Sequence, residues 1–119
     1  FDIMKIKDFQ DTKNLRFFCE NKGKLKTKAN INELIKAINK KDIKKISENL
    51  YNDFGPIIEQ KFKIVREIKA NLKKFNALNS LISGSGPTVI GLFDSIYTSR
   101  EAYFKLKDMY PFVYLTKTF

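Results

Sequence analysis

The chain has 119 residues, of which 43% are hydrophobic and 30% are charged. This length and composition predict one globular domain and argue against disorder. No apolar run approaches the ~20 residues of a membrane-spanning helix. Because the chain contains no histidine, histidine acid–base catalysis and histidine-ligated metal sites are excluded. A single cysteine, Cys19, excludes an internal disulfide and fits a reducing compartment, so we expect a cytoplasmic protein.

The net charge of +10 brings nucleic-acid binding into consideration. Only Arg16, Arg66 and Arg100 are arginines, the residue type best suited to bidentate contacts with bases and phosphates. The lysines are spread over several predicted helix faces, and no alternating string of basic, glycine and aromatic residues is present. The charge therefore favours a solvated lysine surface, while a basic RNA-binding or regulatory domain is the alternative from a different functional class.

The N-terminal segment, up to Lys28, carries the weakest structural signals. Residues 15–19 are compatible with a short strand, and residues 21–24 form a plausible turn. The chain starts with Phe1 rather than methionine, so we expect it to begin inside a longer protein.

Two short helices are predicted next. Residues 31–38 carry isoleucine and leucine at helical spacing, with Asn30 or Asn32 as the N-cap. Asp42 is the predicted N-cap of a second helix that runs over residues 43–50.

A long third helix is predicted over residues 56–74. Pro56 suits its first turn, and Asn76 is the expected left-handed residue after its end. Its apolar positions are expected to lie in the core: Ile57, Ile58, Phe62, Val65, Ile68, Leu72 and Phe75.

The last third of the chain alternates strands and a helix. Apolar runs at 78–83 and 88–94 flank a glycine-dense turn and predict a β-hairpin. Residues 98–101 have the pattern of a capping box that opens a helix, Pro111 ends that helix, and residues 112–116 form a last strand.

This order of elements predicts an α+β domain, a small antiparallel sheet with helices on one face. Only three strands have strong signals. A fourth strand is expected from the segment that ends at Lys28 or from sequence upstream of the chain.

The glycine-dense turn is the candidate functional site. Residues 75–99 contain no lysine or arginine, although the chain is rich in lysine. A Walker A loop would need a Lys-Ser/Thr pair after its last glycine, and a dinucleotide fingerprint would need a third glycine that opens a helix; neither is present. From turn chemistry alone, the alternative to a functional site is that these residues only form a tight hairpin turn. The candidate residues are Ser83, Gly84, Ser85, Gly86, Pro87 and Thr88.

Residues 83–93, Ser-Gly-Ser-Gly-Pro-Thr-Val-Ile-Gly-Leu-Phe, resemble the third signature motif of the GHMP small-molecule kinases. Within that family the string is most similar to the 4-diphosphocytidyl-2-C-methyl-D-erythritol kinases, and homoserine kinases are the near alternative. The resemblance implies a ferredoxin-like C-terminal domain with a four-stranded sheet over residues 30–119. Residues 1–29 would then be a loop or strand segment from the junction with an N-terminal kinase domain outside this chain.

The resemblance also implies a bacterial enzyme of non-mevalonate isoprenoid biosynthesis that transfers the ATP γ-phosphoryl to the 2-hydroxyl of diphosphocytidyl-methylerythritol. ATP and Mg²⁺ would be bound mainly by the N-terminal domain, because the family's ATP loop and catalytic Asp/Lys pair have no match here. No catalytic residue and no metal ligand is therefore expected in this chain, which alone would be inactive. Its partners would be its own N-terminal domain and the small-molecule substrate, and no membrane.

In the family, the glycine motif lies near the ATP phosphates; the alternative is that it only shapes the neighbouring ATP loop. Residues 52–54, Asn-Asp-Phe, resemble a family segment that continues with glutamate, where this chain has Gly55. Glu20, Asp53 and Asp94 are lone carboxylates that we expect to be caps or surface groups.

Overall fold

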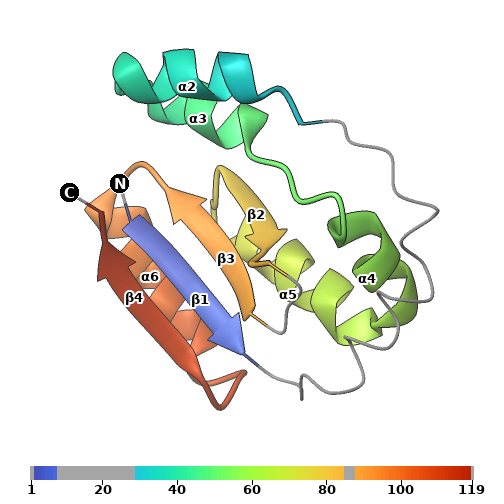
Figure 1. The fold of residues 1–119 in the computed structure, drawn as a ribbon. Coiled ribbons are helices and arrows are strands. Elements are labelled where there is room, and N and C mark those ends of the chain that lie inside the picture. The colour runs from blue at the N-terminus through green and yellow to red at the C-terminus, as the bar shows by residue number, and fades with distance from the viewer. Residues whose placement is uncertain (1, 8–28, 85–87, 119) are drawn as a thin grey trace.

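A four-stranded antiparallel sheet forms the centre of the domain (Figure 1). The computed structural model describes residues 2–7, 29–84 and 88–118. The strands follow the spatial order β2-β3-β1-β4. Their bounds are Asp2–Lys7 for β1, Asn79–Ile82 for β2, Thr88–Phe93 for β3 and Val113–Lys117 for β4.

The predicted α+β class and ferredoxin-like layout are confirmed by this sheet. The expected fourth strand is β1, which comes from the N-terminal segment and lies between β3 and β4. In the register of the sheet, Lys5 is opposite Ile90 of β3 and Tyr114 of β4. Residues 2–7 of the segment that we assigned to the junction therefore form an inner strand of this sheet. The strand predicted at 15–19 and the turn predicted at 21–24 lie outside the described residues.

Five helices are present in the described part of the chain, and Figure 1 shows α5 and α6 behind the sheet. They are α2 (Ile31–Asn39), α3 (Ile43–Asn49), α4 (Gly55–Lys61), α5 (Lys63–Lys74) and α6 (Ile96–Leu106). None of these helices has both the length and the apolar character that a membrane span requires.

The main core lies between the sheet and the helices α4, α5 and α6. Its buried side chains are Ile58, Val65, Ile68, Leu72, Ile82, Val89, Phe93, Ala102, Leu106 and Tyr110. In a strand, successive side chains point to opposite faces, so Leu81, Ile90 and Leu92 belong to the other face of β2 and β3. That other face meets α2 and α3 in a second, smaller cluster that includes Ala37, Ile46 and Leu92. Helices therefore pack on both faces of the sheet, whereas the sequence predicted them on one face.

The two short helices begin where the sequence predicts. The side chain of Asn30 accepts a hydrogen bond from the backbone N–H of Glu33 at 3.2 Å. Asp42 accepts one from the N–H of Lys45, also at 3.2 Å. Asn76 has the expected left-handed backbone, with φ of 72°. These three signals act within a few residues of sequence, so local sequence alone identifies them.

The prediction of one long helix over residues 56–74 is wrong, because the helix breaks at Phe62. The backbone of Phe62 is extended, with φ of −113° and ψ of 104°, and it closes α4 and opens α5. The guanidinium of Arg66 donates to the carbonyls of Glu59 and Gln60 at the end of α4. These carbonyls belong to the last turn, where helix carbonyls lose their own partners. A side chain from α5 thus satisfies groups that the break leaves open.

Replacing Arg66 with alanine is expected to destabilise the domain by about 1–2 kcal/mol, because two terminal carbonyls lose a charged donor. Urea unfolding of the two proteins measures this difference. Lys63→Ala is the matched control, because the Lys63 ammonium is exposed and pairs with Glu67 at 3.7 Å, within its own helix. Equal stability of the Arg66→Ala and Lys63→Ala variants would contradict the capping role of Arg66.

The predicted capping box at residues 98–101 is also wrong, because α6 begins earlier. Ser95 is the N-cap, and its hydroxyl oxygen accepts from the N–H of Tyr97 at 3.2 Å. Thr98 instead donates its hydroxyl to the carbonyl of Ser95 at 3.1 Å, inside the first turn. Glu101 pairs with Lys105 at 3.1 Å. Thr98 and Glu101 therefore make contacts within α6 and do not cap its N-terminus.

Candidate functional site

The glycine-rich motif connects β2 to β3. The N–H of Ser83 donates to the carbonyl of Thr88 at 2.8 Å. This hydrogen bond joins the first and last residues of the motif across the hairpin. Gly84 has a φ of +58°, in the left-handed region that favours glycine. Ser83 and Gly84 are exposed, and Thr88 is half-buried. The candidate residues Ser85, Gly86 and Pro87 lie outside the described residues.

Asn52 fixes the start of this motif from another part of the chain. Its side-chain amide donates to the carbonyls of Ile82 and Gly84, each at 2.6 Å. Its side-chain oxygen accepts from the N–H of Phe54 at 2.9 Å. Asn52 lies between α3 and α4, so a single side chain ties this connection to the backbone at the entry of the glycine-rich turn.

Asn79 makes an equivalent set of bonds at the other end of β2. Its amide donates to the carbonyls of Ser47 at 2.5 Å and Leu50 at 3.3 Å. Its oxygen accepts from the N–H of Ser80 at 2.8 Å. Two asparagines from separate parts of the chain thus hold β2 against the end of α3 and the segment after it.

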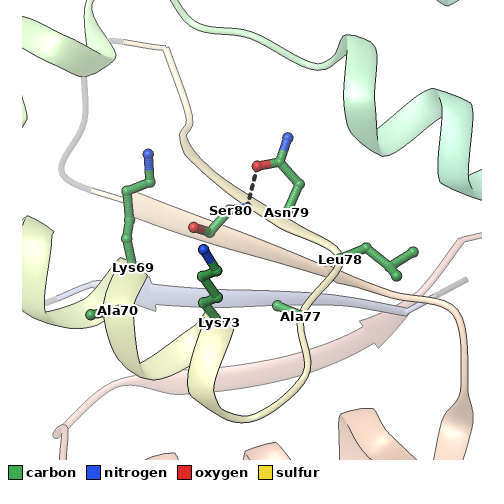
Figure 2. Close-up of a pocket in the computed structure, with 7 residues that line it drawn as sticks. All are labelled: Lys69, Ala70, Lys73, Ala77, Leu78, Asn79 and Ser80. Carbon is green, nitrogen blue, oxygen red and sulfur yellow. Dashed lines mark hydrogen bonds between the residues drawn. The ribbon is translucent and has the colours of Figure 1, made fainter.

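Two adjoining pockets follow the open edge of β2. The first has a volume of about 380 Å³ and lies between the end of α5 and β2; Figure 2 shows the ammonium groups of Lys69 and Lys73 with Asn79 and Ser80. The second, of about 320 Å³, reaches from Lys69 and Ser80 to Asn52. Lys69 forms an ion pair with Glu59, whose carboxylate compensates its charge. Lys73 lies in the last turn of α5, where the helix dipole attracts cations and repels anions. The first pocket is therefore a poor site for phosphate.

Of the three lone carboxylates, Glu20 lies outside the described residues, and Asp53 and Asp94 are described. Asp94 is exposed at the end of β3. One carboxylate oxygen of Asp53 is buried, without a hydrogen-bond partner among the described residues, so Asp53 is not the simple surface group or cap that we expected. Over residues 2–7, 29–84 and 88–118, no three His, Cys, Asp or Glu side chains gather to hold a metal ion.

The sequence is similar to known kinases. Residues 34–111 match the family model described as GHMP kinases C terminal. A 4-diphosphocytidyl-2-C-methyl-D-erythritol kinase of Thermoanaerobacter pseudethanolicus is 45% identical over 85 residues, which are 71% of this chain and 29% of that protein. The protein of the same name from Clostridium novyi is 38% identical over 89 residues, 75% of this chain and 32% of its own length. The chain thus matches about a third of the length of these relatives.

Two solved structures share the fold. A crystal structure of 4-(cytidine 5'-diphospho)-2C-methyl-D-erythritol kinase has a TM-score of 0.74 at 14% identity, and the match covers 96% of this chain and 41% of that one. Homoserine kinase from Cytophaga hutchinsonii has a TM-score of 0.70 at 16% identity, and the match covers 98% of this chain and 41% of that one. At these identities the two structures support the fold and do not distinguish between the two substrates.

Proposed function

This chain belongs to the GHMP kinase family, to the C-terminal part of that fold, and from this membership we propose that it works as one domain of a larger ATP-dependent kinase. The acceptor that we propose is the 2-hydroxyl of 4-diphosphocytidyl-2-C-methyl-D-erythritol. The observation that carries this choice is the 45% identity over 85 residues to a kinase named for that substrate. Its product would serve non-mevalonate isoprenoid synthesis, and we place the enzyme in the cytoplasm of a bacterium.

We assign the glycine-rich motif a role beside the ATP phosphates. Phosphoryl transfer is catalysed mainly by positioning and by stabilising charge on the phosphates. Residues 83–88 carry no ionisable side chain, so their contribution would come from backbone shape and N–H groups. The Asn52 amide supports this proposal, because it fixes the backbone at Ile82 and Gly84 where the motif begins. ATP and Mg²⁺ would be held mainly by the N-terminal part of the kinase, which is the partner that we propose for this domain.

A chimera tests the function. In the T. pseudethanolicus kinase, this chain would replace the matching C-terminal segment. We expect the chimera to phosphorylate diphosphocytidyl-methylerythritol with a kcat/KM within about tenfold of the parent enzyme, a difference of about 1.4 kcal/mol in the barrier. Product formation is measured with ATP and Mg²⁺ present. The N-terminal part without this chain is the control and is expected to be inactive.

Homoserine is the second acceptor in the same assay, since the homoserine kinase fold also matches. Preference of the chimera for homoserine would contradict the proposed substrate but not the kinase class. A folded chimera that transfers phosphate to neither acceptor would contradict the proposed function.

A further inference from the structure

The strand β4 is the outermost strand of the sheet on the side away from β2 (Figure 1). Its only partner strand is β1, so one of its two sides is paired. In an antiparallel pair, alternate residues of such a strand direct their backbone N–H and C=O groups outward. The side chains of Asn52 and Asn79 bond to the backbone of β2, whereas no side chain of the described residues bonds to the backbone of β4.

The residues of β4 favour pairing with a further strand. The strand reads Val-Tyr-Leu-Thr-Lys and contains no glycine or proline. Tyr114 is 61% exposed, Phe112 directly before the strand is 55% exposed, and Thr116 is exposed as well. Proteins usually protect an edge strand with charged side chains, proline, a bulge or a covering segment. The one charged residue of β4 is Lys117, at its end, so the middle of the strand has no such protection.

A second copy of β4 fits this edge in the antiparallel orientation. With a two-fold axis at Leu115, this residue lies opposite its own copy. Tyr114 of each copy then lies opposite Thr116 of the other, and Val113 lies opposite Lys117. An aromatic residue opposite a β-branched one is a favourable cross-strand pair, and the symmetry produces this pair twice. The two Lys117 residues are at opposite ends of the pairing, so like charges do not face each other.

We propose that two copies of this chain associate through β4 and join their sheets into one continuous antiparallel sheet. This inference goes beyond the proposed function and does not depend on it. A two-fold contact uses β4 of both copies, so the assembly closes at two chains. The strands β3 and β1 separate β2 from β4. The glycine-rich motif and the two pockets along β2 therefore stay outside the contact.

Sedimentation equilibrium of the full chain at increasing concentration tests the association. A contact made by one short strand belongs to the small, transient interfaces, so we expect a Kd of about 10–100 μM at about 0.15 M NaCl. The net charge of +10 on each copy opposes association. Raising the salt to about 0.5 M should therefore lower the Kd at least about threefold. A chain that stays monomeric at about 500 μM in both salts would overturn the inference.

Two double variants test the register. Tyr114→Glu with Thr116→Glu places glutamate opposite glutamate twice, so we expect the Kd to rise at least about tenfold, although the net positive charge falls. Tyr114→Glu with Thr116→Lys places opposite charges there and should return the Kd to within about threefold of the parent chain. Ile31→Glu with Ile35→Glu is the matched control, because it adds two glutamates at positions of α2 that are 65% and 50% exposed. Its Kd should stay within about threefold of the parent value.

The outcomes separate this contact from others. Unchanged association of the Glu/Glu variant, or no recovery in the Glu/Lys variant, would overturn the pairing of β4 with itself. Loss of association in the α2 control would overturn it as well, because the contact would then involve α2. Urea unfolding checks that each variant keeps its stability.

Hydrogen exchange of the unmodified chain needs no variant. The outward amides of β4 should exchange at least about threefold more slowly at about 200 μM than at about 2 μM, because pairing protects them. Equal exchange at the two concentrations would overturn the inference.

Discussion

Replacing Asn52 with alanine is expected to lower kcat/KM of the chimera about a hundredfold, because a displacement of about one ångström at a positioning element can cost that much. The substitution removes both donors to the carbonyls of Ile82 and Gly84, at the entry of the glycine-rich motif. It also removes the hydrogen bond that the side-chain oxygen of Asn52 accepts from the N–H of Phe54. A loss of stability of about 1–3 kcal/mol should accompany the loss of activity. Kinetics at saturating and limiting ATP, with urea unfolding of the same samples, measure both effects.

Asn79→Ala is the control, because Asn79 makes the same number of bonds without touching the motif. Its amide also donates to two carbonyls, those of Ser47 and Leu50, and its oxygen also accepts one N–H, that of Ser80. We expect a similar loss of stability from this substitution and a change in kcat/KM of less than about tenfold. Equal catalytic losses in the two variants would show that Asn52 matters only for folding.

Gly91→Val is expected to destabilise the domain by about 3 kcal/mol or more, the upper range for an overpacked core. Gly91 lies in β3 against α5, and a Cβ atom there would be 2.7 Å from Cδ2 of Leu72. Leu72 is fully buried, and its Cδ1 and Cγ would also lie within 3.4 Å of the new atom. The side chain of Leu72 therefore cannot turn away without disturbing the core. Urea unfolding of the chain measures the effect.

Two further variants make this prediction specific. Gly55→Ala should change stability by less than about 1 kcal/mol, because nothing lies within 4 Å of a Cβ at that helical position. Leu72→Ala alone should cost about 2–5 kcal/mol. Combined with Gly91→Val, it should cost less than the sum of the two changes, because the space that the leucine side chain vacates receives the new valine side chain. Strict additivity would contradict the clash between these residues.

Local signals account for the parts of the fold that the sequence predicts well. The caps at Asn30 and Asp42 and the left-handed Asn76 each depend on close neighbours in the sequence. The strands β2, β3 and β4 lie close to their predicted limits, because apolar runs and turn residues delimit them.

The break at Phe62, which we predicted wrongly, and the exact position of β1, which we did not assign, share a physical cause, since both depend on contacts that a local pattern does not contain. Helical periodicity passes through Phe62 without interruption, and the break there is compensated by Arg66 from the following helix. The strand β1 pairs with partners from the far end of the chain, at Thr88–Phe93 and Val113–Lys117, and its own sequence has no strong strand signal.

In the candidate site, too, local features are predicted from the sequence and long-range contacts are not. The glycine-rich motif is visible in the sequence, because glycine and proline stand between two apolar runs. The support of the motif is not visible, because Asn52 acts on the carbonyls of Ile82 and Gly84, which are distant in the sequence. At residues 52–54 the resemblance pointed to a glutamate, and this chain has Gly55 in its place. In the structure, Asn52 is the residue of this segment that makes hydrogen bonds to the carbonyls of Ile82 and Gly84.

The strand β2 is an edge strand of the sheet. When the backbone groups of an edge strand are free, other chains can add strands to it. The carbonyls of Ile82 and Gly84 already receive the amide of Asn52, and the N–H of Ser80 is bonded to the side chain of Asn79. A foreign strand would have to displace both asparagines before it could pair along this edge. The two side chains that hold β2 in place therefore also protect the domain from aggregation, and a variant without them would be prone to assemble through β2.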